Sequence, residues 1–97
     1  MDILVAYDIA NTDGRAGANR LKQVAGICEK YGQRLQFSVF QCRLSPTRLA
    51  RLIGELQDVI DHKLDRVSVF RFQGDIEKAA THIGRPQASK LGEPWMI

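Results

Sequence analysis

The chain has 97 residues, 44% of them hydrophobic and 26% charged, values that indicate one globular domain and leave no room for a second. Fourteen lysines and arginines against eleven acidic residues give a net charge of +3, which suits contacts with phosphate but is also common on ordinary soluble proteins. Because no apolar run reaches the roughly 18 residues of a membrane span and the N-terminus lacks the cationic start of a signal peptide, we expect a cytoplasmic protein without membrane contact.

The first predicted element is a strand over residues 3–9. Its apolar run ends in Asp8 and is followed by the polar loop 11–14, a pattern typical of a central strand covered on both faces. Side-chain alternation puts Asp8 on the same side as Leu4 and Ala6, with its carboxylate at the carboxyl end of the strand. Two interpretations remain open at this point: the carboxylate either caps the turn that follows or serves a functional site.

A helix is predicted next, and its periodic apolar face ends near Tyr31. Gly32 is positioned to end this helix in a left-handed cap. Three cations, Arg15, Arg20 and Lys22, lie near the helix start, where the helix dipole opposes positive charge. An anionic ligand would account for them, and a solvated helix face is the alternative.

The β-rich segment 34–44 changes its parity in the middle. Its apolar residues occupy odd positions up to Val39 and even positions from Phe40 onward. Because the side chains of a strand alternate strictly, this switch requires either a bulge or a tight reversal near residues 38–39. No Gly, Asn or Pro marks a turn there, so the residues do not decide between the two.

A second helix is predicted to begin at Ser45, whose hydroxyl can cap exposed amides, with Pro46 at its first position. Its apolar stripe predicts packing on a sheet. Alternation over residues 65–72 predicts the last core strand, with aromatic side chains on one of its faces. Cys28 and Cys42 lack metal-ligand spacing, so we expect reduced thiols that pack in the core.

The remaining residues, 74–97, have weak periodicity. Residues 79–83 are predicted as a short edge strand. The chain then ends in Trp95, Met96 and Ile97, and three large apolar residues at a free end are expected to dock on a partner.

This order of elements is the βαββαβ pattern of a ferredoxin-like α+β fold, provided that segment 34–44 is counted as two strands. Residues 1–73 would form the core and residues 74–97 a C-terminal strand and tail of the same single domain. Two helices cover only one face of such a sheet. The other face needs a partner, and for so short a chain a second copy is expected.

Four stretches carry a family resemblance when they are taken together. They are Ala6-Tyr-Asp-Ile9, Cys28-Glu-Lys-Tyr-Gly32, Arg34-Leu-Gln-Phe-Ser-Val-Phe40, and the pair Ile60-Asp61 and Asp65-Arg-Val67. Their order and spacing cover roughly residues 3–72, which is far more specific than any single stretch. On these motifs the chain resembles the small CRISPR-associated spacer-acquisition protein, the second of the two universal adaptation proteins.

The resemblance implies a homodimer of ferredoxin-like protomers in which a C-terminal strand crosses to the partner's sheet, which would give residues 79–83 a role. It also implies one of two functions. The first is a metal-dependent endonuclease that cleaves RNA or double-stranded DNA. The second is a non-catalytic DNA-binding scaffold that bridges the larger integrase subunits during spacer integration. The resemblance does not extend to the tail, and our own hypothesis is that Trp95, Met96 and Ile97 dock on the integrase.

In that family the aspartate that ends the first strand is the proposed metal ligand, which is Asp8 here. One carboxylate is a poor site for Mg²⁺ or Mn²⁺, so we expect the Asp8 residues of two chains to share the ion across a twofold axis. Such an ion can polarise a phosphodiester oxygen and lower the pKa of a water.

The same comparison implies nucleic-acid contacts for six residues: Arg15, Arg20, Lys22, Arg34, Ser38 and Phe40. Two positions depart from the family pattern, because Gln41 stands where a glutamate is common and Gln23 where an arginine is common. Both departures weaken the case for catalysis more than the case for binding. His62 and His82 lie outside the motifs and are interpreted as surface residues. A third possibility for this fold, a small-ligand regulatory module, lacks a polar pocket signature.

Overall fold

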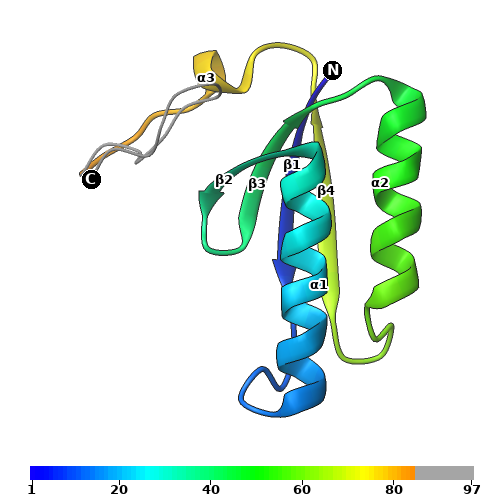
Figure 1. The fold of residues 1–97 in the computed structure, drawn as a ribbon. Coiled ribbons are helices and arrows are strands. Elements are labelled where there is room, and N and C mark those ends of the chain that lie inside the picture. Colours follow the sequence, from blue (N-terminus) through cyan, green and yellow to red (C-terminus); the bar gives the residue numbers. More distant parts are fainter. Residues whose placement is uncertain (85–97) are drawn as a thin grey trace.

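The computed structural model describes residues 1–84 (Figure 1). In chain order its elements are β1 (Asp2–Asp8), α1 (Arg15–Tyr31), β2 (Gly32–Gln36), β3 (Val39–Arg43), α2 (Pro46–Val59), β4 (Arg66–Phe72) and α3 (Ile76–Ala79). The strands form one sheet in the order β2-β3-β1-β4, and all neighbouring pairs are antiparallel. This arrangement confirms the predicted ferredoxin-like α+β fold.

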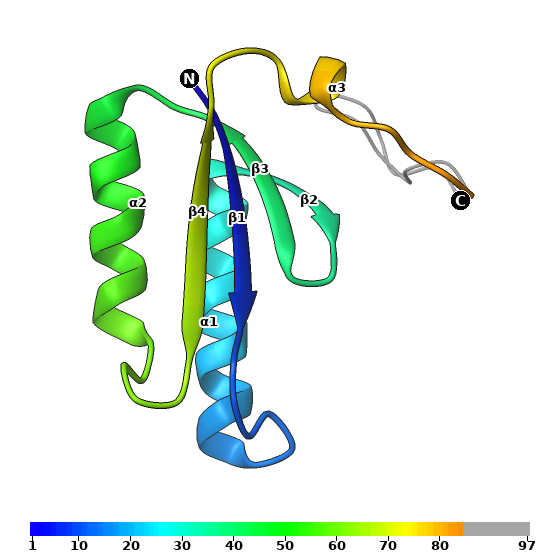
Figure 2. The same ribbon diagram turned by 180° about the vertical axis from the view of Figure 1, so that it is seen from behind.

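The two long helices lie on the same side of the sheet, so that Figure 1 shows them in front of the strands and Figure 2 behind them. On the helix side β1 contributes Ile3, Val5 and Tyr7 to the buried core. The alternate residues of β1, Leu4 and Ala6, are only half-buried on the other side. Strand β1 is therefore central, as predicted, and within residues 1–84 of one chain only its helix side is covered; the predicted cover of the other face by a second copy stays a prediction. We call the uncovered side of the sheet the open face.

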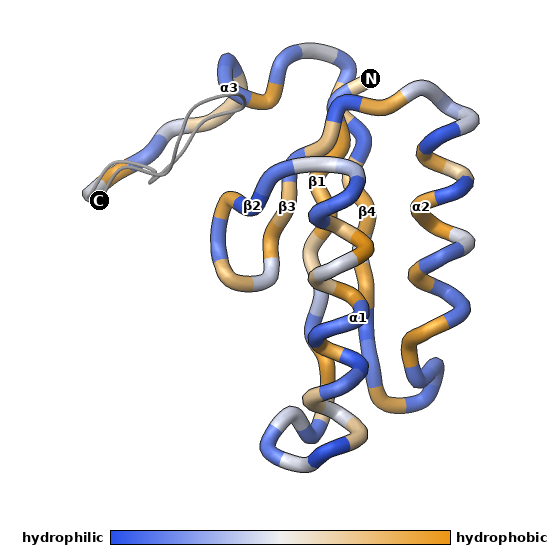
Figure 3. The backbone as a smooth tube through the Cα atoms, in the orientation of Figure 1, coloured by the Kyte–Doolittle hydropathy of each residue, from blue (hydrophilic) through white to orange (hydrophobic). Residues whose placement is uncertain are grey.

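Helix α2 begins as its sequence predicts. The Ser45 hydroxyl accepts a hydrogen bond from the Arg48 amide at 3.2 Å, and Pro46 occupies the first helical turn. The apolar stripe points inward, with Leu49, Leu52 and Leu56 buried. Figure 3 shows this amphipathic pattern as alternating hydrophobic and hydrophilic segments along the helix.

The parity switch predicted near residues 38–39 is a tight reversal, and a separate pairing irregularity lies earlier in the segment. Strands β2 and β3 form an antiparallel hairpin that turns at residues 37–38, and the pairing shifts register between Arg34 and Gln36. Because of this turn, the apolar residues change from odd to even positions. Consequently Phe40 is fully buried, whereas Phe37 lies at the hairpin tip and is exposed.

Gly32 does not end α1 in a left-handed cap, and that prediction is wrong. Its backbone is extended, with φ −165° and ψ −157°, and it is already the first residue of β2. A Cβ atom at this position would lie 2.2 Å from the Gln41 carbonyl oxygen and 2.5 Å from the Cys42 sulfur. The glycine is required because β3 approaches the backbone closely here, a tertiary constraint that the local pattern does not contain.

The region after β4 also differs from the prediction. Residues 76–79 form the short helix α3, and residues 80–84 form no strand in this single chain. An edge strand needs a neighbouring strand to pair with, which the described part of one chain does not offer at this place. The tail residues Trp95, Met96 and Ile97 lie outside the described residues. None of the helices within residues 1–84 has the length and apolar character needed to cross a bilayer.

Candidate functional site

Asp8 ends β1 on the open face and is exposed to solvent. The strand register puts Arg66, the first residue of β4, directly opposite, so the two side chains share one face with Cβ atoms about 5 Å apart. Within residues 1–84, Asp8 forms no ion pair and accepts no side-chain hydrogen bond. Its carboxylate therefore does not cap the turn, and it is available to an external ligand.

The backbone immediately after Asp8 is held from two sides. Asp65, which precedes β4, accepts a hydrogen bond from the Ala10 amide at 2.9 Å. The Arg20 guanidinium donates to the Ala10 carbonyl at 3.1 Å and to the Asp65 carboxylate at 2.8 Å. The backbone amide and the backbone carbonyl of Ala10 are thus both hydrogen-bonded to distant residues. We call Ala10, Arg20 and Asp65 the strand-exit clamp.

The start of α1 closes around the same loop. Gly17 is buried, and a Cβ atom there would lie 2.1 Å from the Asn11 carbonyl oxygen and 2.5 Å from that of Ala10. Asn11 adopts a left-handed conformation, with φ 57°, which asparagine tolerates better than most residues. The loop can fold back onto the helix only because position 17 has no side chain. Asp8 consequently stands on a rigid strand end.

The carboxylate of Asp65 is completely buried, with 0% of its side chain exposed. Burial alone raises the pKa of Asp65, but the bonds from Arg20 and from the amides of Asp61 and Ala10 outweigh burial and hold the pKa below its ordinary value. Asp65 is therefore ionised at neutral pH. The clamp is a charge-assisted network, the stronger kind of buried polar contact.

The predicted basic cluster divides into two environments. Arg15, the first residue of α1, and Lys22 are exposed, and no ion pair within residues 1–84 neutralises them. Arg20 is different, because it is committed to Asp65 and only 17% of its side chain is exposed. Its position near a helix start is explained by that internal carboxylate. The structure thus brings Arg20 to the strand exit beside Asp8, but as a clamp residue.

The three residues of stretch 34–40 that were predicted to contact nucleic acid also lie in different environments. Arg34 is exposed on β2, with its guanidinium 5.0 Å from the Phe40 ring centroid and 3.7 Å from the Glu29 carboxylate. Ser38 is half-buried at the hairpin turn. Phe40 itself is 0% exposed and stacks on Tyr7 in the core. The prediction that Phe40 contacts nucleic acid directly is therefore wrong for this conformation, since its ring has no surface left for a ligand.

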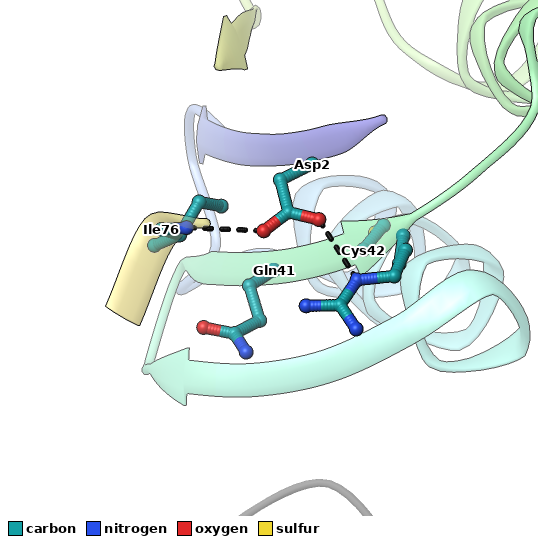
Figure 4. A pocket seen from close by; sticks show the side chains of 5 residues that line it. Asp2, Gln41, Cys42 and Ile76 are labelled. Carbon is teal, nitrogen blue, oxygen red and sulfur yellow. Dashed lines mark hydrogen bonds and ion pairs between the residues drawn. The ribbon is translucent and has the colours of Figure 1, made fainter. Parts of the chain in front are cut away.

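The hollows near the opposite end of the open face do not adjoin Asp8. One, of about 10 Å³, is lined by Asp2, Gln41 and Ile76 among others (Figure 4). Asp2 accepts hydrogen bonds from the Ile76 amide at 3.0 Å and from the Arg43 guanidinium at 2.9 Å. This volume is at the lower limit for one water molecule. These contacts anchor α3 to the start of β1, at the end of the strand opposite to Asp8.

Comparison with known proteins identifies the family. The family model described as CRISPR associated protein Cas2 matches residues 1–79. The CRISPR-associated endonuclease Cas2 of Halalkalibacterium halodurans is 36% identical over 97 residues, which is the full length of both chains. The CRISPR-associated endoribonuclease Cas2 of Chlorobaculum tepidum is 41% identical over 91 residues, 94% of each chain. The chain belongs to the Cas2 family.

A solved Cas2 structure extends this result to the fold. The crystal structure of Streptococcus pyogenes Cas2 at pH 6.5 superposes with a TM-score of 0.79 and 36% sequence identity, covering 87% of this chain and all of that one. The match confirms the resemblance that the four sequence stretches indicated. It also confirms that this Cas2 chain has the fold predicted from the order of its elements.

For three residues around the end of β1, the sequence did not predict the position that the structure shows. Arg66 follows a predicted strand start, but only the antiparallel register puts it beside Asp8. Asp65 lies in a quoted motif, yet its bond to Ala10 joins residues 55 positions apart, which periodicity does not reveal. The alternation along the strand groups Phe37 with the other apolar residues. Only a turn signal at residues 37–38, which the sequence lacks, would have predicted that its side chain is exposed.

Proposed function

We propose that this chain is a CRISPR adaptation endonuclease that cleaves phosphodiester bonds in RNA or DNA with Mg²⁺ or Mn²⁺ held by the Asp8 residues of a homodimer. The supporting observation is Asp8 itself: an exposed carboxylate without a partner among residues 1–84, on a rigid strand end, with Arg66 opposite. The relatives named above as an endonuclease and an endoribonuclease support the same reaction class.

The open face supports the homodimer. Leu4 lies at its centre, opposite Gln41 on one side and Phe70 on the other. Half of the Phe70 side chain is exposed, and the side-chain amide oxygen of Gln41 (Oε1) is buried without a hydrogen-bond donor within residues 1–84. An unsatisfied buried oxygen costs about 1–3 kcal/mol. A second copy packed on this face would cover the apolar surface around Leu4 and Phe70.

The metal fits this chain as a shared ion. No group of three or more His, Cys, Asp or Glu residues in the described part of one chain is arranged to hold an ion. Magnesium is usually bound by one or two carboxylates together with water and substrate phosphate. Two Asp8 residues, one from each protomer, meet that requirement. When bound, the ion would supply Lewis-acid polarisation of the phosphate.

The chain's own residues would bind and orient the substrate. Arg66 offers a guanidinium on the same face as Asp8, and Arg15 and Lys22 add positive charge at the loop and helix that follow β1. Guanidinium groups suit phosphate because their paired N–H donors match its oxygens. The strand-exit clamp would keep Asp8 in position when the polyanion binds.

The proposal is tested by cleavage assays on purified protein. We expect nucleic-acid cleavage with Mg²⁺ or Mn²⁺ that EDTA stops. Asp8→Asn should reduce the rate by more than about 100-fold, because loss of even an outer-shell partner of a metal ligand costs about 10–100-fold. Asp58→Asn, which changes an equally exposed carboxylate on α2, is the matched control and should leave the rate unchanged. Equal cleavage by Asp8→Asn and the wild type would refute the assignment.

The dimer is tested separately by light scattering. Phe70→Glu would put a charge at the centre of the open face and should yield monomers. Leu64→Glu is the control, since Leu64 is 51% exposed and Phe70 is 50% exposed, but Leu64 precedes β4 in a turn. A wild-type monomer at micromolar concentration, or a dimer unaffected by Phe70→Glu, would contradict the proposed interface.

The second candidate is the non-catalytic scaffold that holds DNA for the larger integrase subunits. The observation that favours it is Gln41, because β3 carries no carboxylate on the open face to add to Asp8. A scaffold binds DNA with an affinity that falls steeply with salt, cleaves nothing, and keeps its function in Asp8→Asn. Removing residues 90–97, which include Trp95, Met96 and Ile97, should then abolish assembly with the integrase while DNA binding persists. Intact assembly would exclude docking through the tail.

A further inference from the structure

Phe37 is the most exposed aromatic residue within residues 1–84, with 91% of its side chain accessible. Single exposed apolar residues are common on protein surfaces and need no explanation by themselves. Phe37 is unusual because of where it lies and how it is held. It occupies the tip of the β2–β3 hairpin, at the same end of the sheet as Asp8, since Ala6 pairs with Val39 and the chain turns just beyond that pair.

The hairpin tip is fixed by the residue that precedes Asp8. The Tyr7 amide donates to the Ser38 carbonyl at 3.0 Å, and the Tyr7 hydroxyl donates to the Phe37 carbonyl at 3.2 Å. Tyr7 is itself buried and stacked on Phe40. The backbone of Phe37 is therefore coupled through one buried residue to the strand end that carries Asp8. The backbone of this turn is held by hydrogen bonds to Tyr7, so the exposed Phe37 side chain is presented from a fixed position.

The surroundings of Phe37 indicate what kind of ligand it suits. Its neighbours Arg34 and Gln36 are exposed and polar, and Ser38 is half-buried. Contact centres between proteins usually gather several apolar side chains around a buried anchor. Within residues 34–38, Phe37 is the sole large apolar side chain recorded as exposed. An isolated exposed aromatic ring among polar neighbours is the arrangement on which proteins stack unpaired bases.

We infer that Phe37 is a stacking platform for an unpaired nucleobase of the polynucleotide that binds at Asp8. This inference rests on the proposed function and adds to it a preference for substrates with unpaired bases. A paired base inside a duplex hides its face, so the platform favours single strands, loops and frayed ends. Because every base has a stacking face, the contact selects unpaired structure and carries little sequence preference.

The test measures binding in EDTA, so that it does not depend on cleavage. Phe37→Ala should weaken binding of a single-stranded oligonucleotide about tenfold, within the range expected for one lost stack. Phe37→Leu should lose nearly as much, because it keeps an apolar side chain without a ring, and Phe37→Trp should bind as well as the wild type. The salt dependence should be unchanged, since no charge is removed. Leu64→Ala, at another exposed apolar position, is the control and should bind normally.

Two ligands separate stacking from other causes. A polymer of abasic sugar phosphates should bind the wild type and Phe37→Ala equally, and so should a blunt duplex. In a Trp95→Phe background, the fluorescence of Phe37→Trp should be quenched by the single strand and not by the abasic polymer. Equal losses on the abasic polymer, or full affinity in Phe37→Leu, would overturn the inference.

A third result would also overturn it. If Phe37→Ala turned the dimer into a monomer by light scattering, Phe37 would belong to the contact between copies. Failure of the proposed function has a different signature. A wild type that binds no polynucleotide would reject both proposals, whereas binding that is insensitive to Phe37 and cleavage that needs Asp8 would reject the stacking platform alone.

Discussion

Replacing Asp65 by asparagine should expose how much the strand-exit clamp contributes to stability. The buried carboxylate accepts bonds from the Ala10 amide at 2.9 Å, the Asp61 amide at 2.8 Å and Arg20 at 2.8 Å. Asparagine has the same shape but offers one acceptor oxygen. Its NH₂ group would face an N–H donor, and Arg20 would lose its charge partner.

The magnitude follows from those contacts. At least one buried amide loses its acceptor, which costs about 1–3 kcal/mol, and a charge-assisted bond is lost as well. Arg20 retains 17% exposure, so part of its charge can be hydrated and the full penalty of a buried unpaired ion does not apply. We therefore expect Asp65→Asn to lower the free energy of unfolding by about 3 kcal/mol. That is a large fraction of the about 5–15 kcal/mol typical of a domain.

Urea unfolding followed by circular dichroism measures this difference. All variants are compared at one protein concentration, because binding between copies would add to stability. Asp61→Asn is the control. The Asp61 carboxylate accepts the amides of Lys63 and Leu64 in an exposed turn, a role that asparagine also fills. Its effect should stay within about 0.5 kcal/mol.

The pH dependence gives a second readout. Because the folded-state pKa of Asp65 lies below its unfolded value, ionisation of this group stabilises the fold above the unfolded pKa of about 3.9. The stabilisation is lost as the pH falls through the lower folded pKa. The difference between wild type and Asp65→Asn should thus be constant from pH 5 to 8 and shrink in stronger acid. A difference below about 1 kcal/mol at pH 7, or one that changes between pH 5 and 8, would refute the reasoning.

Three further predictions concern the core. Phe40→Ala should lower the free energy of unfolding by about 4 kcal/mol, measured in the same urea assay, because it empties a fully buried site; an effect on nucleic-acid binding without a loss of stability would contradict its burial. Gly32→Ala should cost about 3 kcal/mol or more, since its Cβ would lie 2.2 Å from the Gln41 carbonyl oxygen; a variant as stable as the wild type would mean that β3 does not approach this closely. Burial raises the pKa of the Cys28 thiol to about 12 and that of the Cys42 thiol to about 11. Neither thiol should therefore react with a thiol-specific dye at pH 8 until urea unfolds the chain. Rapid labelling of the native protein would show that these thiols are accessible.

Features set by neighbouring residues could be predicted from the sequence. The start of α2 is one example, because a capping serine followed by proline acts within a single turn. The side of β1 on which Asp8 lies is another, since alternation along a strand is a local property. Four short stretches in the right order were sufficient to indicate the Cas2 family, which the comparisons confirm.

Features that depend on distant segments could not be predicted. Gly32 follows an amphipathic helix, which usually indicates a cap, but β3 requires it as an extended residue without a side chain. The predicted nucleic-acid residue Phe40 is instead part of the core, and Phe37, for which no role was predicted, is exposed. The turn at residues 37–38 put Phe40 into the core and Phe37 at the surface, and no glycine, asparagine or proline marked that turn.

The sequence by itself determined the order of helices and strands up to β4, except for the reversal within segment 34–44, together with the family and the presence of Asp8 at the end of the central strand. These features follow from local periodicity and short motifs. Only the tertiary structure decided that Arg66 stands opposite Asp8 and that Arg20 belongs to Asp65. The Asp8–Arg66 register pair and the Arg20–Asp65 ion pair each join residues 45 or more positions apart. Such contacts depend on which segments pack together. The sequence pattern of one segment does not predict which distant segment will pack beside it.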